Sequence, residues 1–219
     1  MSRKQFDLIV FDWDGTLMDS TAAIVKCIQA AARDIGAPVP SRDQAAYVIG
    51  LGLMEAMQAV LPGVDPKLLP RMVERYRYHF LTQDQELTLF EGARDMLADL
   101  SQQGYFLAVA TGKTRVGLNR ALDQVKLLSL FDATRCADET FSKPHPAMLQ
   151  ELTRELGQDI RRTVMIGDTT HDLQMAINAG AAGVAVEFGA HPSEQLRALK
   201  PLFVAGSIGE LHQWLADFG

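Results

Sequence analysis

The sequence predicts an α/β fold: a doubly wound, Rossmann-like parallel sheet with a small all-helical domain inserted after its first strand. From Leu87 onward, short apolar runs alternate with segments of helical periodicity, as in successive βαβ units. One further apolar run, residues 8–11, precedes a stretch that shows only helical periodicity. We therefore expect an α/β core of residues 1–17 and 85–219 and a helical domain of residues 18–84. The alternative is one α/β domain with an unusually helical first connection.

Helix-end signals divide the helical stretch. Ser41 and Gln44 have the spacing of a capping box. Asp65 precedes a proline, as at a helix start. The two glycines of the segment 49–53 should weaken or break a helix, and the Met54/Met57 pair after it is interpreted as core of the inserted domain. Helices are expected over 18–36, from 41, over 54–60 and from 65 to about 83.

Beyond this stretch, the apolar period alternates between strand and helix to the end of the chain. Gly104 and Gly180 stand where two of the predicted helices end, and Ser207 and Glu210 match a capping box at the start of the last helix. The expected strands are 8–11, 105–110, 133–137, 164–166, 183–186 and 202–204. The expected helices are 92–103, 115–127, 146–156, 171–179, 193–199 and one from 207.

Composition excludes several classes of protein. The 219 residues are 47% hydrophobic and 22% charged, which is ordinary for a globular protein. The net charge of −6 argues against nucleic-acid binding. The two cysteines, Cys27 and Cys136, suggest neither a disulfide framework nor a zinc site, and are expected to be free core thiols. With no signal peptide or membrane span found, we expect a soluble, cytoplasmic protein, monomeric or weakly dimeric.

Two carboxylates follow the first predicted strand. Asp12 and Asp14 are two positions apart, so extended backbone would point both to one side, and Gly15 lets the chain turn away. Ligands of doubly wound sheets bind beyond the carboxyl ends of the strands. The pair is therefore a candidate for chemistry, although a plain strand-exit turn has the same residue types.

Three more polar groups follow apolar runs. Thr111 and Gly112 suit a phosphate oxygen at a helix start, or are only a βα turn. Lys143 lies in a proline-stiffened turn and could balance carboxylates, or be a surface lysine. Asp168 and Asp172 begin the next helix, where capping by Asp168 or Thr170 is the simpler interpretation. The histidines are expected to be solvated or capping: His145, His171 and His191.

Together these groups predict a cation site. Carboxyl ends of parallel strands meet at one edge, and two carboxylates about 4 Å apart repel by roughly 4 kcal/mol at an effective dielectric of 20. A cation must offset this, and an all-oxygen, water-retaining site favours Mg²⁺.

The ordered set of motifs resembles the haloacid dehalogenase superfamily, in particular its phosphoglycolate phosphatase-like branch. The matching motifs are Asp12-Trp13-Asp14-Gly15-Thr16, Thr111, Lys143-Pro144-His145-Pro146 and Gly167-Asp168 through Asp172. The resemblance spans nearly the whole chain and identifies the helical stretch as that family's small cap domain. It implies a Mg²⁺-dependent phosphatase that hydrolyses a small phosphorylated metabolite.

The resemblance also implies roles for the residues. Asp12 would be the nucleophile that forms an aspartyl-phosphate, and Asp14 the general acid and base. The Asp12 carboxylate, the Asp14 carbonyl and Asp168 would hold Mg²⁺. Thr111 and the Gly112 amide would bind phosphate oxygens and Lys143 would steady the nucleophile and the phosphoryl group. Asp172 would orient metal-bound waters or Lys143.

At two positions the sequence differs from the pattern common in phosphoglycolate phosphatases, so the motifs do not identify the substrate. Gly112-Lys113 stands where many phosphoglycolate phosphatases have Asn-Lys, and Glu91-Gly92 where Pro-Gly is common. The segment 49–53 either faces the substrate or is a kink in the cap. A phosphosugar mutase with the same intermediate is an alternative that Thr16 disfavours, and a non-catalytic binding module is another, which the intact motifs disfavour.

Overall fold

A parallel sheet of six strands forms the centre of the computed structural model, which describes residues 4–82 and 87–218. The strand order is β3-β2-β1-β4-β5-β6, so the direction of winding reverses between β1 and β4. The predicted doubly wound sheet is therefore confirmed. Its strands are β1 (Leu8–Phe11), β2 (Phe106–Thr111), β3 (Ala133–Cys136), β4 (Thr163–Gly167), β5 (Ala182–Val186) and β6 (Val204–Ala205).

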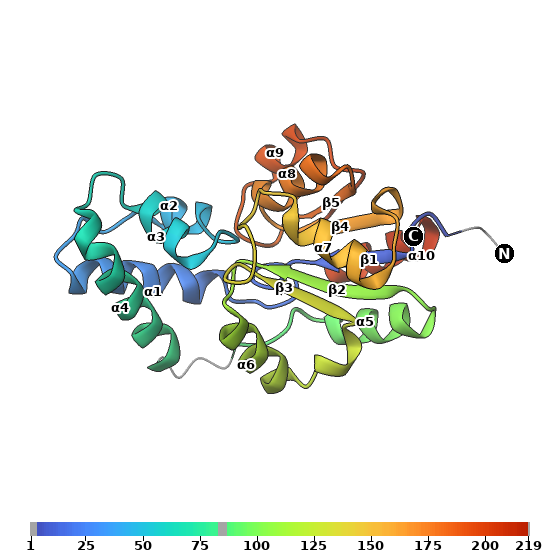
Figure 1. Ribbon diagram of the computed structural model, residues 1–219, viewed down its shortest axis with the longest axis horizontal. Coiled ribbons are helices and arrows are strands. Elements are labelled where there is room, and N and C mark those ends of the chain that lie inside the picture. Colours follow the sequence, from blue (N-terminus) through green and yellow to red (C-terminus); the bar gives the residue numbers. More distant parts are fainter. Residues whose placement is uncertain (1–3, 83–86, 219) are drawn as a thin grey trace.

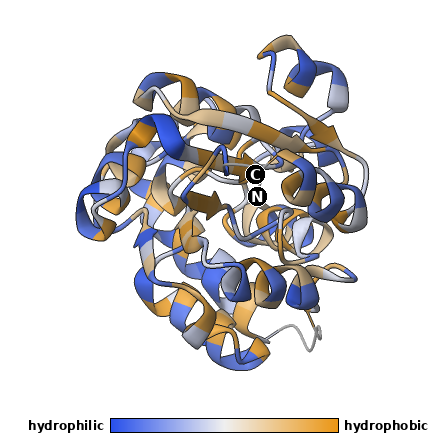
Figure 2. Cartoon of the chain, turned by 90° about the vertical axis from the view of Figure 1, so that its right-hand side faces the viewer, coloured by the Kyte–Doolittle hydropathy of each residue, from blue (hydrophilic) through white to orange (hydrophobic). Residues whose placement is uncertain are grey.

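Helices cover both faces of the sheet (Figure 1). One face packs against α5 (Ala93–Gln102), α6 (Arg115–Val125) and α10 (Ile208–Phe218). The opposite face packs against α7 (Ala147–Leu156) and α8 (Thr170–Ala179), and α9 (Ser193–Ala198) lies beside α8 and β5. Short 3-10 turns, η2 (Leu128–Leu130) and η3 (Ile160–Arg162), complete this part. Figure 2 shows the resulting pattern, with largely apolar strands between helices that have one polar side.

The helices between β1 and α5 form a separate group at the left of Figure 1. They are α1 (Thr21–Asp34), α2 (Arg42–Tyr47), α3 (Leu53–Val60) and α4 (Leu69–Thr82), which a 3-10 turn, η1 (Pro66–Leu68), precedes. Ile28, Met57 and Met72 are buried in an apolar cluster of this group alone. The cluster is the core of what we call the helical insertion. The exact boundaries predicted at 17/18 and 84/85 stay predictions, and the second lies outside the described residues.

The two chain segments that join the insertion to the sheet run side by side. The Asp19 amide donates to the Thr88 carbonyl at 2.9 Å, and the Phe90 amide to the Leu17 carbonyl at 3.0 Å. Met18 forms a bridge with Leu89. These bonds hold residues 18–20 outside the helix, so the prediction that a helix begins at 18 is wrong by one turn.

Other predicted ends are corrected in the same way. Asp65 caps the turn η1, and the α-helix begins only at Leu69, while the predicted end near 83 lies outside the described residues. The last strand begins at Val204, because Leu202 is 54% exposed and contributes no apolar face to the sheet. Met57 is buried as predicted, but Met54 is 46% exposed, so the prediction that both belong to the core is wrong for Met54.

Over residues 4–82 and 87–218, none of the helices combines the length and the apolar character that crossing a bilayer requires.

Candidate active site

Asp12 is held at the end of the central strand. Its amide donates to the Ile166 carbonyl at 2.9 Å, which extends the β1–β4 ladder by one residue. The chain then turns at Gly15, whose φ of 81° favours glycine. A Cβ at this position would lie 2.2 Å from Oδ2 of Asp168. The turn therefore brings the first motif directly against the loop that follows β4.

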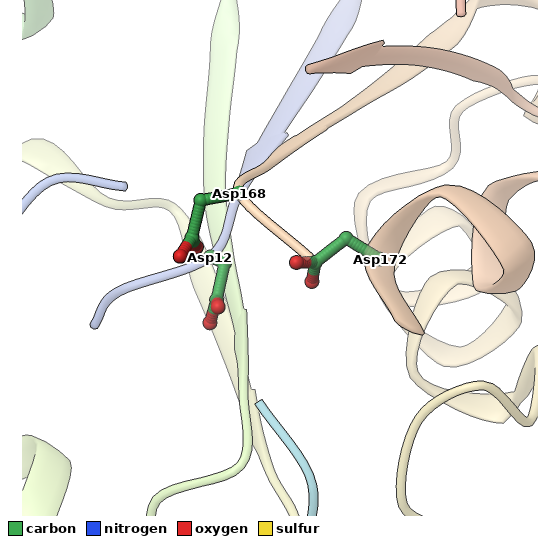
Figure 3. A group of neighbouring side chains, drawn as sticks. All are labelled: Asp12, Asp168 and Asp172. Carbon is green, nitrogen blue, oxygen red and sulfur yellow. The ribbon is translucent and has the colours of Figure 1, made fainter. Parts of the chain in front are cut away.

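Three carboxylates meet at the point where the sheet changes its winding direction. Asp12 follows β1, Asp168 follows β4, and Asp172 lies in the first turn of α8. One oxygen of each lies within 4.8 Å of the others, and all three side chains are buried. In Figure 3, Asp12 and Asp168 lie together and Asp172 points toward them from its helix. At an effective dielectric of 20, each ionised pair at this distance would repel by roughly 3 to 4 kcal/mol.

Lys143 partly balances this charge. Its Nζ lies 2.8 Å from Oδ1 of Asp12 and 2.6 Å from Oδ1 of Asp172, with the side chain fully buried. Burial disfavours the charged ammonium, but the two carboxylates outweigh burial and raise the pKa of Lys143. The lysine is therefore charged and joins two members of the cluster. One ammonium against three carboxylates leaves a deficit of positive charge.

The shortage of positive charge is reflected in raised pKa values of two of the carboxyl groups. Burial raises the pKa of Asp12 well above its ordinary value, and Asp172 and Asp168 add to the rise while Lys143 opposes it. Burial, followed by the charge of Asp172, raises the pKa of Asp168 to about 7. Both shifts have the same meaning: a proton or a cation is needed when these groups share the site.

Asp168 is positioned by both chain segments around it. Its Oδ1 accepts from the Thr16 hydroxyl at 2.8 Å, and its Oδ2 accepts from the Ala190 amide at 2.7 Å. Gly189 completes the surrounding cradle, since a Cβ there would lie 2.2 Å from Oδ2. The carboxylate is thus fixed in direction before any ligand arrives.

Asp172 has both of its oxygens engaged by the protein. Oδ1 meets Lys143, and Oδ2 accepts from the amide and the hydroxyl of Thr169 at 3.1 and 2.6 Å. Thr169, rather than the predicted Asp168 or Thr170, is the N-cap of α8 and forms a capping box with Asp172. The prediction that Asp168 or Thr170 caps α8 is therefore wrong, and Asp172 both takes part in the cap and belongs to the cluster.

The donor set fits a hard divalent cation. Oδ2 of Asp12 is buried and makes no hydrogen bond or ion pair with any described residue. It lies in the group formed with Asp168 and Asp172, and every donor is a carboxylate oxygen, the ligand type that Mg²⁺ prefers. Oδ2 of Asp172 already accepts two hydrogen bonds and its Oδ1 meets Lys143, whereas each oxygen of Asp168 accepts only one from the described residues. Asp12 and Asp168 are therefore the side chains best suited to hold the ion.

Asp14 lies apart from this cluster and has its own partners. The Ser20 hydroxyl donates to Oδ1 at 2.6 Å, and Nζ of Lys113 lies 2.9 Å from Oδ2. Lys113 also lies 4.9 Å above the ring of Phe80 in α4. Asp14 is thus held between Ser20 and Lys113, which lies in the loop after β2.

A cavity of about 450 Å³ opens above these groups. Asp12 and Asp14 line it together with Thr111 and Gly112, and the helical insertion supplies a large share of the other lining residues. Thr111 ends β2, one residue later than predicted, and its Oγ1 accepts from the Lys113 amide at 3.2 Å. Asp12 is the residue shared by the carboxylate cluster and the cavity.

The insertion contacts the core through the segment between α2 and α3. A Cβ at Gly112 would lie 2.3 Å from the Leu51 carbonyl oxygen, and the Gly52 amide donates to the Ser142 hydroxyl at 2.7 Å. The segment 49–53 both separates two helices and lines the cavity, so the two interpretations left open by the sequence are compatible.

Two histidines reinforce this contact. His171 and His191 each place Nε2 near the Tyr47 carbonyl, at 2.9 and 3.0 Å. Nδ1 of His191 accepts from the Thr170 amide at 3.0 Å, and His191 is buried. His191 is therefore a capping residue but not a solvated one. His145 is exposed and accepts from the Ala147 amide, as expected.

The structure brings together every side chain that the motifs singled out, in two adjoining groups. Asp12, Lys143, Asp168 and Asp172 form the buried cluster, while Thr111, Gly112 and Asp14 line the cavity beside Asp12. The roles of these residues stay predictions. Sequence reasoning missed the contacts of Ser20 and Lys113 with Asp14, and the cradle at Gly189. Ser20 lies four residues beyond the first motif and could have been considered with it, whereas no signal marks Gly189.

Comparison with known proteins points to one family. A family model described as haloacid dehalogenase-like hydrolase matches residues 9–186. A "Probable phosphatase IndB" of Dickeya dadantii (strain 3937) is 37% identical over 209 residues, covering 93% of this chain and 91% of that protein. A phosphoglycolate phosphatase of Aliivibrio fischeri (strain ATCC 700601 / ES114) is 31% identical over 208 residues, covering 90% and 91%. A crystal structure from Haemophilus somnus 129pt, described as a "predicted phosphoglycolate phosphatase", superposes with a TM-score of 0.87 at 23% identity, covering 97% and 99%. The last match shows a shared fold.

Proposed function

Because the chain belongs to the haloacid dehalogenase-like hydrolase family, we propose that it is a phosphatase that hydrolyses a small phosphate monoester with the help of Mg²⁺. The observation that carries the proposal is Asp12, a buried carboxylate with one oxygen held by Lys143 and the other unpartnered by described residues, at the base of a cavity beside Asp14. The two relatives named as phosphatases support the same reaction class.

The first step would form a covalent intermediate on Asp12. A carboxylate oxygen attacks phosphorus while the bond from phosphorus to the ester oxygen breaks, and Asp14 gives its proton to the departing alcohol. Lys143 holds the attacking carboxylate in position through Oδ1. Thr111 and the Gly112 amide are placed to bind the phosphoryl oxygens, because both line the cavity beside Asp12.

The second step would release phosphate. Asp14, now ionised, takes a proton from a water molecule, the water oxygen attacks phosphorus, and the bond to Asp12 breaks. Ser20 and Lys113 stabilise the ionised form of Asp14 at this stage by a hydrogen bond and an ion pair. Mg²⁺ held by Asp12 and Asp168 would neutralise phosphoryl charge in both steps. The helical insertion would exclude bulk water from the cavity.

The test is phosphate release from a panel of monoesters, including phosphoglycolate, sugar phosphates and nucleotides, with Mg²⁺ and with a chelator. We expect Mg²⁺-dependent release, and a loss on the order of 10⁴-fold in Asp12→Asn, the scale seen when a covalent nucleophile is removed. Asp19→Asn is the matched control, since Asp19 is an exposed carboxylate of the same segment. Circular dichroism checks that both variants are folded.

Other outcomes would contradict the proposal in distinct ways. Substantial turnover by Asp12→Asn would remove Asp12 as nucleophile. Isomerised sugar phosphate in place of free phosphate would identify a mutase. If no ester of the panel releases phosphate, with or without Mg²⁺, the result would indicate a binding module.

A further inference from the structure

The cavity beside Asp12 has more room than the reacting groups need. Its volume of about 450 Å³ corresponds to roughly fifteen water molecules at about 30 Å³ each, and lies within the range of pockets that bury drug-sized ligands. Asp12, Asp14, Thr111 and Gly112 are only four of the residues that line it. The remaining space is therefore available to the alcohol half of a phosphate ester, and its walls indicate the chemistry of that half.

The walls away from the reacting groups are apolar. Leu51, Leu53 and Phe80 of the insertion are half-buried and line the cavity. Leu81 and Val116 also line it, and they are 55% and 71% exposed. Hydrocarbon thus runs along the cavity from Phe80 outward to exposed residues of both the insertion and the core.

Among the described residues, the cationic side chains that line the cavity are either paired or exposed. Lys113 is paired with Asp14, and its ammonium lies over the ring of Phe80. The other cationic lining residues, Arg77 and Arg120, are exposed. A short substrate such as phosphoglycolate would place its carboxylate near Asp14 and the apolar wall, where it gains no unpaired cation and loses hydration.

We propose that the physiological substrate is a phosphate monoester of an alcohol with a bulky, apolar body, aromatic or branched, which packs against Phe80, Leu51 and Val116. This inference rests on the proposed phosphatase function and narrows its substrate class. Tyr76 also lines this cavity and adds a second aromatic ring to its wall.

The experiment compares phenylpropyl phosphate, propyl phosphate and phosphoglycolate as substrates in the presence of Mg²⁺. The two alkyl esters have leaving alcohols of similar acidity, so the ratio of their kcat/KM values reports the cavity and not the chemistry. We expect phenylpropyl phosphate to exceed propyl phosphate and phosphoglycolate by about 10- to 100-fold, the range for filling an apolar pocket.

Two variants test the wall directly. Phe80→Ala should reduce the phenylpropyl-to-propyl ratio by about 10-fold. Tyr78→Ala is the control, since Tyr78 is an exposed aromatic residue of the same helix that does not line the cavity. Val116→Ser, at a position that is already exposed, should lower the same ratio without endangering the fold.

A binding arm separates this inference from the proposed function. Calorimetry with Asp12→Asn compares phenylpropylphosphonate with propylphosphonate, neither of which can be hydrolysed. Release of phosphate with a preference for propyl phosphate or phosphoglycolate would overturn the inference and leave the function standing. Tighter binding of the phenylpropyl compound without turnover of any ester would support the cavity's preference and overturn the function. If no ester is turned over and neither phosphonate binds, both the inference and the proposed function are overturned.

Discussion

The two sides of the cavity differ in chemical character, one charged and the other apolar. The core side carries buried charge, with Asp12, Lys143 and Asp168 fixed by ion pairs and backbone amides. The side formed by the helical insertion carries hydrocarbon from α4 and from the segment 49–53. Under the proposed function, the reacting groups belong to the core, whereas the groups that select the substrate belong mainly to the insertion, with Val116 of α6 added from the core.

The two sides also differ in what they do for stability. Apolar burial in the insertion stabilises the fold by roughly 25 cal/mol for each Å² removed from water. The carboxylate cluster of the core lowers the stability of the fold, because three buried acids share one lysine. Changes to the cluster should therefore affect both activity and stability, whereas changes to the wall should affect selectivity first.

The largest effect that sharpens this contrast is expected for Lys143→Met. The substitution keeps the apolar stem but leaves Asp12 and Asp172 without their ammonium. The free energy of unfolding of the metal-free protein should fall by about 3 to 5 kcal/mol at neutral pH, as for a broken buried ion pair. Urea denaturation measures the fall. Phosphatase activity should be lost as well.

Two companion variants make this result interpretable. Lys67→Met removes an exposed lysine and should change the unfolding free energy by no more than about 0.5 kcal/mol. Adding Asp172→Asn to Lys143→Met should restore part of the lost stability, since only one carboxylate then remains unpaired. If Lys143→Met is as stable as Lys67→Met, the ammonium does not balance the cluster.

The second effect is a pH dependence that comes from Asp168. Its pKa of about 7 lies above the ordinary 3.8, so between these values the folded protein holds a proton that the unfolded chain has released. Stability of the chelated protein should therefore fall as pH rises from about 4 to about 7, by up to about 4 kcal/mol at 1.36 kcal/mol per pKa unit.

The contribution of Asp168 is isolated by comparing the wild type with Asp168→Asn at each pH. Burial lowers the pKa of His191 to about 4, which adds stability as pH rises through the same range and opposes the acid. The unfolding free energies of the wild type and Asp168→Asn are therefore subtracted at each pH, and the difference should carry the predicted fall. Mg²⁺ should stabilise the wild type at pH 7 more than the variant. A flat difference would show that Asp168 titrates normally.

The sequence predicted the core side of the cavity far better than the other. Asp12, Thr111 and Asp168 each follow an apolar strand, and a parallel sheet brings such ends to one edge, so their meeting follows from topology. Strand and helix ends were less certain: the hydrogen bonds of Leu17 and Asp19 with the returning chain, invisible in the apolar pattern, displace the start of α1.

The apolar wall could not be predicted in the same way. Phe80 and Lys113 come together only because the insertion docks at a particular angle, and helical periodicity gives the apolar face of a helix but not its partner. The same limit applies to Lys113 and Asp14, whose ion pair joins two loops across the cavity. The sequence predicts a solvated or capping role for His191, and the residue does cap α8, but nothing in the sequence indicates that its second nitrogen meets the Tyr47 carbonyl.

The smallest predicted effect tests the docking of the insertion. His191→Phe keeps a ring that can stack on Tyr47, whose centroid lies 4.8 Å away, but removes the bonds to the Thr170 amide and the Tyr47 carbonyl. We expect a loss of about 1 to 2 kcal/mol in the unfolding free energy. Amide exchange should become faster over residues 47–53, while α1 and α4 keep their protection because their shared core is untouched. His145→Phe removes a comparable bond, to the Ala147 amide at the start of α7, and should lower stability by about 0.5 to 2 kcal/mol but leave exchange over residues 47–53 unchanged. If stability falls but exchange over 47–53 does not change, His191 only caps α8, and the insertion is held by other contacts such as that of Gly52 with Ser142.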